Sequence, residues 1–191
     1  MAPSSWRKSG PIYLAQPSET GPIQLAGDNG SSIAFVSAAE NLGALESGHA
    51  SLMVRDSDGV VSVVTPTSWD GDVEDAVISG DGLHIAFTTA ATGVVAGVGG
   101  GVDQVYVASR PAVGAAWSFE LVSVTGDGSP FAARASGSSL ATDNWDLTIS
   151  GDGKRVGWLT ASTNAEPAVT SSTDAPWLVL RDRPGGLPRW R

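Results

Sequence analysis

Residues 79–87 read Ser-Gly-Asp-Gly-Leu-His-Ile-Ala-Phe, and the chain repeats this stretch. It recurs 71 positions later, at residues 150–158, as Ser-Gly-Asp-Gly-Lys-Arg-Val-Gly-Trp. A looser copy, Gly-Asp-Asn-Gly-Ser-Ser-Ile-Ala-Phe, lies 52 positions earlier at residues 27–35. Each copy places an Asp-Gly or Asn-Gly step, which tolerates the positive φ of a tight hairpin turn, before a short apolar run. The repeat therefore predicts a strand, a turn and a second strand in every copy.

Further strands follow at similar offsets within each copy. The expected first strands are 23–26, 76–79 and 147–150, the third strands are 52–56, 105–109 and 178–182, and the fourth strands are 61–65 and 121–125. The third copy shows no fourth strand before the chain reaches residues 184–191. Four short antiparallel strands in a repeated unit are typical of a β-propeller blade. We expect an all-β fold with about three such blades.

Three segments carry a resemblance to a known family. Residues 77–87 and 148–158, together with the Leu-Val-Leu-Arg-Asp strand at residues 178–182, resemble the TolB-type, WD-repeat-like propeller blades common in bacterial secreted and periplasmic proteins. The resemblance covers residues 22–183 and implies an extracytoplasmic location. Residues 1–30, in contrast, lack the continuous apolar core of a secretory signal.

The repeat divides the chain into three parts. Residues 1–21 form an N-terminal segment with a spare strand at 12–15, residues 22–183 hold the blades, and residues 184–191 form a tail. The three repeats span residues 22–65, 73–125 and 143–183. Closed propellers have four to eight blades, so three are too few for a ring. Either a homodimer completes the ring, or the chain is a piece of a longer propeller.

The net negative charge of the chain argues against polyanionic partners. The chain has 11 Lys and Arg against 20 Asp and Glu, which gives a net charge of −9 and opposes binding to nucleic acid or anionic membrane surfaces. One uncharged stretch, residues 85–102, contains several Thr and Gly residues and is explained better by the repeat than by membrane insertion. No cysteine is present, which excludes disulfides and thiol chemistry.

Acidic residues gather before the second and third repeats. With the 71-residue offset, Asp72 aligns with Asp143 and Asp75 aligns with Asp146. Carboxylates at this spacing can converge on calcium, which takes six to eight oxygen ligands, although the pattern lacks the glycine and glutamate of an EF-hand loop. The alternative is that Asp75 and Asp146 accept hydrogen bonds from backbone N–H groups in the entry loop of each blade.

Trp69 and Trp145 lie beside these carboxylates. Aromatic rings next to acids can form a stacking platform for sugars or peptides. Alternatively, each ring packs between neighbouring blades. The predicted ligand-binding set is therefore Trp69, Asp72, Asp75, Asp143, Trp145 and Asp146.

Signatures of enzymes are largely absent from the sequence. No Gly-x-Ser-x-Gly motif occurs, and the two histidines, His49 and His84, are expected in loops and turns. We assign no catalytic residue and no cofactor. The expected function is a non-enzymatic scaffold that binds a protein or peptide. Two alternatives stay open: a carbohydrate-binding or carbohydrate-active propeller, and a supporting fragment of a larger propeller enzyme.

Overall fold

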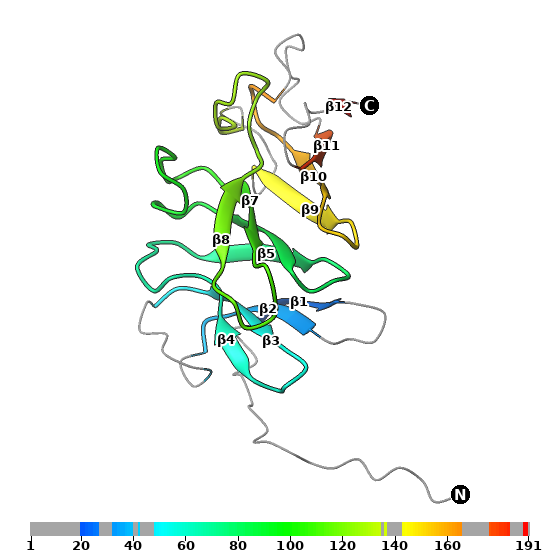
Figure 1. Cartoon of the computed structure of the whole chain (residues 1–191). Coiled ribbons are helices and arrows are strands. Elements are labelled where there is room, and N and C mark those ends of the chain that lie inside the picture. Colours follow the sequence, from blue (N-terminus) through cyan, green and yellow to red (C-terminus); the bar gives the residue numbers. More distant parts are fainter. Residues whose placement is uncertain are drawn as a thin grey trace, which may run out of the picture.

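The computed structural model describes residues 20–26, 32–39, 42, 48–134, 136, 143–165, 176–183 and 189–190. Its strands form three four-stranded sheets, stacked in chain order (Figure 1). The first sheet contains β1 (Thr20–Ala26), β2 (Ser32–Ser37), β3 (Ser51–Arg55) and β4 (Val61–Val63). The second contains β5 (Val73–Ile78), β6 (His84–Thr89), β7 (Gln104–Ser109) and β8 (Ser118–Leu121). The third contains β9 (Asn144–Ile149), β10 (Arg155–Thr160), β11 (Trp177–Asp182) and β12 (Arg189–Trp190).

In each sheet, strands that are neighbours in sequence pair antiparallel, which is the strand order of a propeller blade. The predicted all-β fold with about three four-stranded propeller blades is confirmed. The spare strand at residues 12–15 and the turn at residues 27–30 lie outside the described residues. No helix in the described part of the chain is long and apolar enough to cross a bilayer.

The outer strands differ from the sequence prediction. The fourth strand of the second sheet is Ser118–Leu121, not residues 121–125, because it is a partly exposed edge strand in which polar residues alternate with apolar ones. Val122, which suggested the later position, is buried just after that strand. The third sheet also has a fourth strand, Arg189–Trp190, within the predicted tail. Two residues are too few to show a strand pattern in the sequence.

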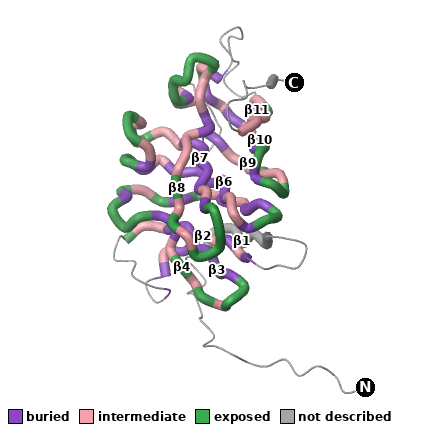
Figure 2. The backbone as a smooth tube through the Cα atoms, viewed as in Figure 1, coloured by how far each residue is buried: buried purple, intermediate pink, exposed green. Residues whose placement is uncertain are grey.

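The sheets pack face to face, and the middle sheet is covered on both sides. One face of the second sheet, called here the N-side face, carries Ile85, Phe87 and Tyr106 and packs on the first sheet. The opposite C-side face carries Ala86, Val105 and Val107 and packs on the third sheet. Figure 2 shows buried segments concentrated in the strands and exposed ones in the loops. The strand register of the first and third sheets likewise assigns each of their side chains to an N-side face or a C-side face.

The repeated Asp-Gly turns form the predicted hairpins. In the second sheet, Ser79 Oγ donates to Asp81 Oδ1 at 2.6 Å, and the N–H of Leu83 donates to the same oxygen at 2.9 Å. Ser150 and Asp152 repeat the first contact in the third sheet at 2.7 Å. The turn glycine has a φ of 70° in one copy and 67° in the other, a backbone conformation that favours glycine. The shared motif thus encodes one turn geometry.

Candidate functional site

Two aligned aspartates join successive sheets. Asp72 Oδ1 accepts a hydrogen bond at 2.6 Å from the N–H of Ala50, the residue just before β3. Asp143 Oδ2 accepts one at 3.4 Å from the N–H of Asp103, the residue just before β7. Asp143 is buried and also accepts from the N–H of Arg134 at 2.8 Å. Both carboxylates therefore bond loop backbone, an arrangement that the sequence had suggested for Asp75 and Asp146.

Asp75 and Asp146 lie in irregular segments of β5 and β9, where the register to the next strand shifts. Asp75 Oδ1 accepts from the N–H of Ala76 at 2.8 Å, and its Oδ2 accepts from the N–H of Leu147 in the third sheet at 3.4 Å. Asp146 is exposed and has a φ of 53°. Asp75 thus connects two sheets, whereas Asp146 points to the surface.

The two tryptophans are in different environments. Trp69 is only 7% exposed, and its ring lies 6.0 Å from that of Phe87 and 5.0 Å from that of Phe119. Trp145 is half-buried in the third sheet, opposite Leu159. The structure does not bring the two indoles together. Trp69 packs between the first and second sheets, so only Trp145 keeps part of its surface accessible.

The carboxylates at the seam of the second and third sheets repel one another. Burial raises the pKa of Glu74, and the charges of Asp103, Asp72 and Asp143 raise it further. Burial and the charge of Asp143 likewise raise the pKa of Asp103. Among the described residues, no group of three or more His, Cys, Asp or Glu side chains is arranged to hold a metal ion. The geometry therefore gives no support to a calcium site there.

His84 lies close to a serine and an aspartate. Its Nδ1 is 2.9 Å from Ser109 Oγ, and its Nε2 is 4.0 Å from Asp81 Oδ2. Ser109 Oγ also accepts from Nη2 of Arg183 at 2.9 Å. The Nε2–Oδ2 distance is too long for a hydrogen bond, so these three groups lack the continuous chain that activates a hydrolase serine. Burial lowers the pKa of His84.

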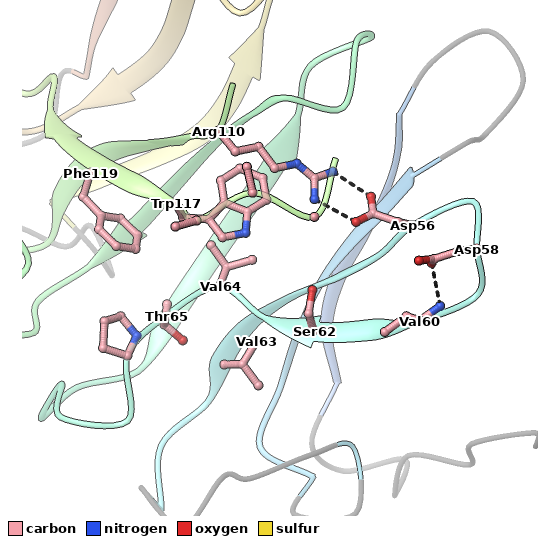
Figure 3. Close-up of a pocket in the computed structure, with 14 residues that line it drawn as sticks. Asp56, Asp58, Val60, Ser62, Val63, Val64, Thr65, Arg110, Trp117 and Phe119 are labelled. Atoms are coloured by element: carbon pink, nitrogen blue, oxygen red, sulfur yellow. Dashed lines mark hydrogen bonds and ion pairs between the residues drawn. The ribbon is translucent and has the colours of Figure 1, made fainter. Parts of the chain in front are cut away.

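A groove of about 690 Å³ opens between the outer parts of the first and second sheets (Figure 3). Ser62 and Val64 contribute to the wall formed by the first sheet, and Trp117 and Phe119 contribute to the wall formed by the second. Trp69 supports this second wall from behind through its edge contact with Phe119. The groove was not predicted from the sequence, because it depends on how far two sheets diverge at the rim.

A buried ion pair joins the two walls of the groove. Arg110 Nη1 and Nη2 donate to Asp56 Oδ2 and Oδ1 at 2.7 and 2.6 Å, and Ser32 Oγ donates to Oδ1 at 2.8 Å. The two side chains are 1% and 7% exposed. The Arg110 guanidinium also lies 4.5 Å from the centre of the Trp117 ring. This pair fixes the two sheets at the position where the groove opens.

The third sheet repeats this arginine contact. Arg110 and Arg183 each follow the third strand of their sheet, and each donates to the carbonyl of the turn glycine, Gly82 O at 2.9 Å and Gly153 O at 3.0 Å. Arg183 also reaches back to Glu120 Oε2 at 2.9 Å. The sequence signal was an arginine one position after the third strand in two repeats. It was missed because the first repeat has an aspartate there.

The Asp56 contact predicts a defined response to acid. The hydrogen bond from Arg110 holds the pKa of Asp56 below its usual value of 3.8. A lowered folded-state pKa stabilises the native state above the unfolded-state value, and the stabilisation is lost as the pH falls through the folded-state value. The difference in unfolding free energy between wild type and Asp56→Asn should therefore shrink as the pH falls below about 4. Urea denaturation at several pH values measures it; a constant difference would contradict the assignment.

Comparison with known proteins adds support at the level of the fold. No known family profile matches the chain, and no curated protein matches it. The structure of TolB from Acinetobacter baumannii matches with a TM-score of 0.52 and 18% identity, over 90% of this chain and 32% of that one. A structure from Agrobacterium tumefaciens described as a TolB matches with a TM-score of 0.53 and 17% identity, over 93% and 50%. This chain has the fold of TolB-type propeller blades.

The predicted resemblance to TolB-type blades is therefore confirmed for the fold. The chain spans about a third of the length of the Acinetobacter baumannii protein and half of the length of the Agrobacterium tumefaciens protein. The tricorn protease structure matches with a TM-score of 0.41 and 14% identity, over 85% of this chain and 13% of that one, which is too weak to support an argument. A likeness of fold does not by itself assign an activity to the chain.

Proposed function

We propose that this chain is a binding scaffold for an extended peptide segment of a protein partner, and that the groove between the first two sheets receives the peptide. The groove itself is the observation that supports this proposal most directly. It combines concave shape, an aromatic wall and a rigid ion pair between its walls, which are common features of recognition sites.

The edge of β4 supplies a backbone for such a peptide. β4 is the last strand of its sheet. At its two ends, Val60 O accepts a hydrogen bond from the N–H of Asp56, and the N–H of Val64 donates to Leu52 O in β3. Along an antiparallel strand, the backbone N–H and C=O groups of successive residues point to alternate sides. The N–H and C=O groups of Val61 and Val63 therefore point away from β3. An extended peptide can pair with such an edge and insert alternate side chains into an adjacent groove. This geometry favours a peptide in strand conformation.

The lining sets the chemistry of the peptide. Val64, Trp117 and Phe119 offer apolar contact, while Asp58 is an exposed carboxylate at the groove. The chain as a whole carries a net charge of −9. We expect a peptide with apolar side chains for the groove and basic residues beside them, because opposite charge raises the rate of association.

The residues predicted from the inter-blade loops enter this proposal as supports. Trp69 holds the Phe119 ring in place from behind. Asp72 fixes the loop ahead of β3, and so helps to position the first sheet against the second. Asp75 and Asp143 bond backbone at the next seam, and Asp146 and Trp145, which keep accessible surface, lie beyond it.

A peptide library displayed on phage tests the proposal. Selection on the wild-type chain should enrich apolar sequences flanked by Lys or Arg. Ala116 lines the groove and is exposed, so Ala116→Trp should fill the groove without disturbing the core. We expect the enriched peptides to bind this variant at least tenfold more weakly, measured by fluorescence anisotropy; tenfold corresponds to about 1.4 kcal/mol.

The matched control is Ala96→Trp, which adds the same bulk at an exposed loop position outside the groove. This variant should bind the peptides like wild type. Equal loss in both variants, or no enrichment at all, would refute the groove as the binding site. A glycan array on the same proteins checks the carbohydrate alternative. Glycan binding that disappears with Trp145→Ala would replace the peptide proposal.

A further inference from the structure

The C-side face of the third sheet is apolar and only partly covered. By strand register, Leu159, Leu178 and Leu180 share this face with Gly157 and Trp145. Leu178 is 46% exposed, and the other two leucines are half-buried. In the described part of the chain, no further sheet packs on this face. An apolar surface of this kind marks an interaction site.

The second sheet shows what normally covers such a face. Its residues at the same register positions, Ala86, Val105 and Val107, are 0% exposed because the third sheet packs on them. Leu178 and Leu180 occupy the register positions of Val105 and Val107. The third sheet thus presents the same packing surface, with leucine in place of valine at these two positions, to a neighbour that the described residues do not provide.

The first sheet presents the complementary surface. Its N-side face carries Phe35, Met53, Val61 and Val63, at the register positions that Phe87, Tyr106, Phe119 and Leu121 occupy in the second sheet. Ala39 and Leu42 of the same chain cluster with these residues and Met53 is 0% exposed, but Phe35, Val61 and Val63 are only half-buried. In both seams inside the chain, the C-side face of one sheet packs on the N-side face of the next. The three described sheets therefore have two outer surfaces that fit one another by the packing rule of the two seams.

We propose that a second copy of this chain covers both surfaces, so that two copies form one six-bladed ring with twofold symmetry. The blade number selects this assembly. Closed propellers have four to eight blades, and six is the only multiple of three in that range. The two copies meet twice, each time with the third sheet of one copy on the first sheet of the other.

Sedimentation velocity of the purified chain tests the proposal. Wild type should sediment as a dimer of the 19.4 kDa chain. Leu178→Lys places a charge on the exposed part of the C-side face and should shift the protein to monomer. Val113→Lys is the matched control, because Val113 is 51% exposed but lies in the loop between β7 and β8, and it should remain a dimer. Circular dichroism establishes that each variant is folded.

Mixing two variants provides a sharper test. Val61→Glu damages the N-side face of the first sheet and should also give a monomer. In a mixed dimer of Leu178→Lys and Val61→Glu, both substitutions meet at one interface, as a Lys and a Glu on opposing faces, and the second interface is wild type. The mixture should therefore regain the dimer mass. A monomeric wild type, or a mixture that stays monomeric, would overturn the proposal and favour further blades from another polypeptide or from a longer chain.

Discussion

Arg110→Ala should destabilise the protein by about 3–5 kcal/mol, because it leaves a carboxylate buried without its partner. Asp56 is 5% exposed, and after the substitution its remaining side-chain donor is Ser32 Oγ. The contacts of Arg110 with Gly82 O and the Trp117 ring are lost as well. Urea denaturation followed by tryptophan fluorescence at pH 7 measures the effect.

Arg155→Ala is the matched control for this experiment. Arg155 Nε donates to Asp182 Oδ1 at 2.6 Å, as short as the buried contact, but the two side chains are 63% and 37% exposed. Exposed ion pairs contribute at most about 1 kcal/mol, so this variant should stay close to wild type. If the two substitutions cost the same, the ion pair at the groove does not join the sheets as described. Binding of groove peptides should fall with Arg110→Ala and persist with Arg155→Ala.

Gly153→Ala should produce the second large loss of stability, for two separable reasons. The glycine has a φ of 67°, and placing another residue there costs about 1–3 kcal/mol. In addition, a Cβ at this position would lie 2.1 Å from Cδ2 of His84 in the preceding sheet, and overpacking of this kind costs about 1–3 kcal/mol more. The free energy of unfolding reports the sum.

Two further variants separate these causes. Gly128 is the glycine of a similar Asp-Gly turn with a φ of 87°, but no atom lies within 4 Å of a Cβ placed there. Gly128→Ala should show the backbone cost alone. His84→Ala removes the ring atoms nearest to the added Cβ, so Gly153→Ala should cost less in that background. Additivity of the two substitutions would show that the seam does not depend on this contact.

Much of the fold was accessible from the sequence because the blade is encoded by a repeat. The Ser-Gly-Asp-Gly motif predicted the hairpins, since its serine and aspartate bond the turn in the same way in both copies. The outer strands were harder to predict. Ser118–Leu121 is partly exposed, and Arg189–Trp190 has two residues, so neither has the apolar pattern that identified the inner strands.

The candidate site was predicted only in part. Spacing correctly paired Asp72 with Asp143, but their backbone partners are 22 and 40 residues away, in the preceding sheet. No local pattern identifies such partners. The sequence also left the environment of Trp69 undecided. A tryptophan beside acidic residues is equally compatible with a position on the surface and with a position in the core between two sheets. The groove required the relative placement of two sheets, which a single sequence does not specify.

Four of the side-chain contacts between the sheets run in the same direction along the chain. Arg110 and Arg183 each reach back to an acid in the sheet before, and Asp72 and Asp143 each accept from a loop of the sheet before. The first and second sheets are therefore each secured in part by side chains that are synthesised after them. On the ribosome, each sheet would emerge with open partners and become locked only when the next one folds, so that stability would spread from the N-terminus towards the C-terminus.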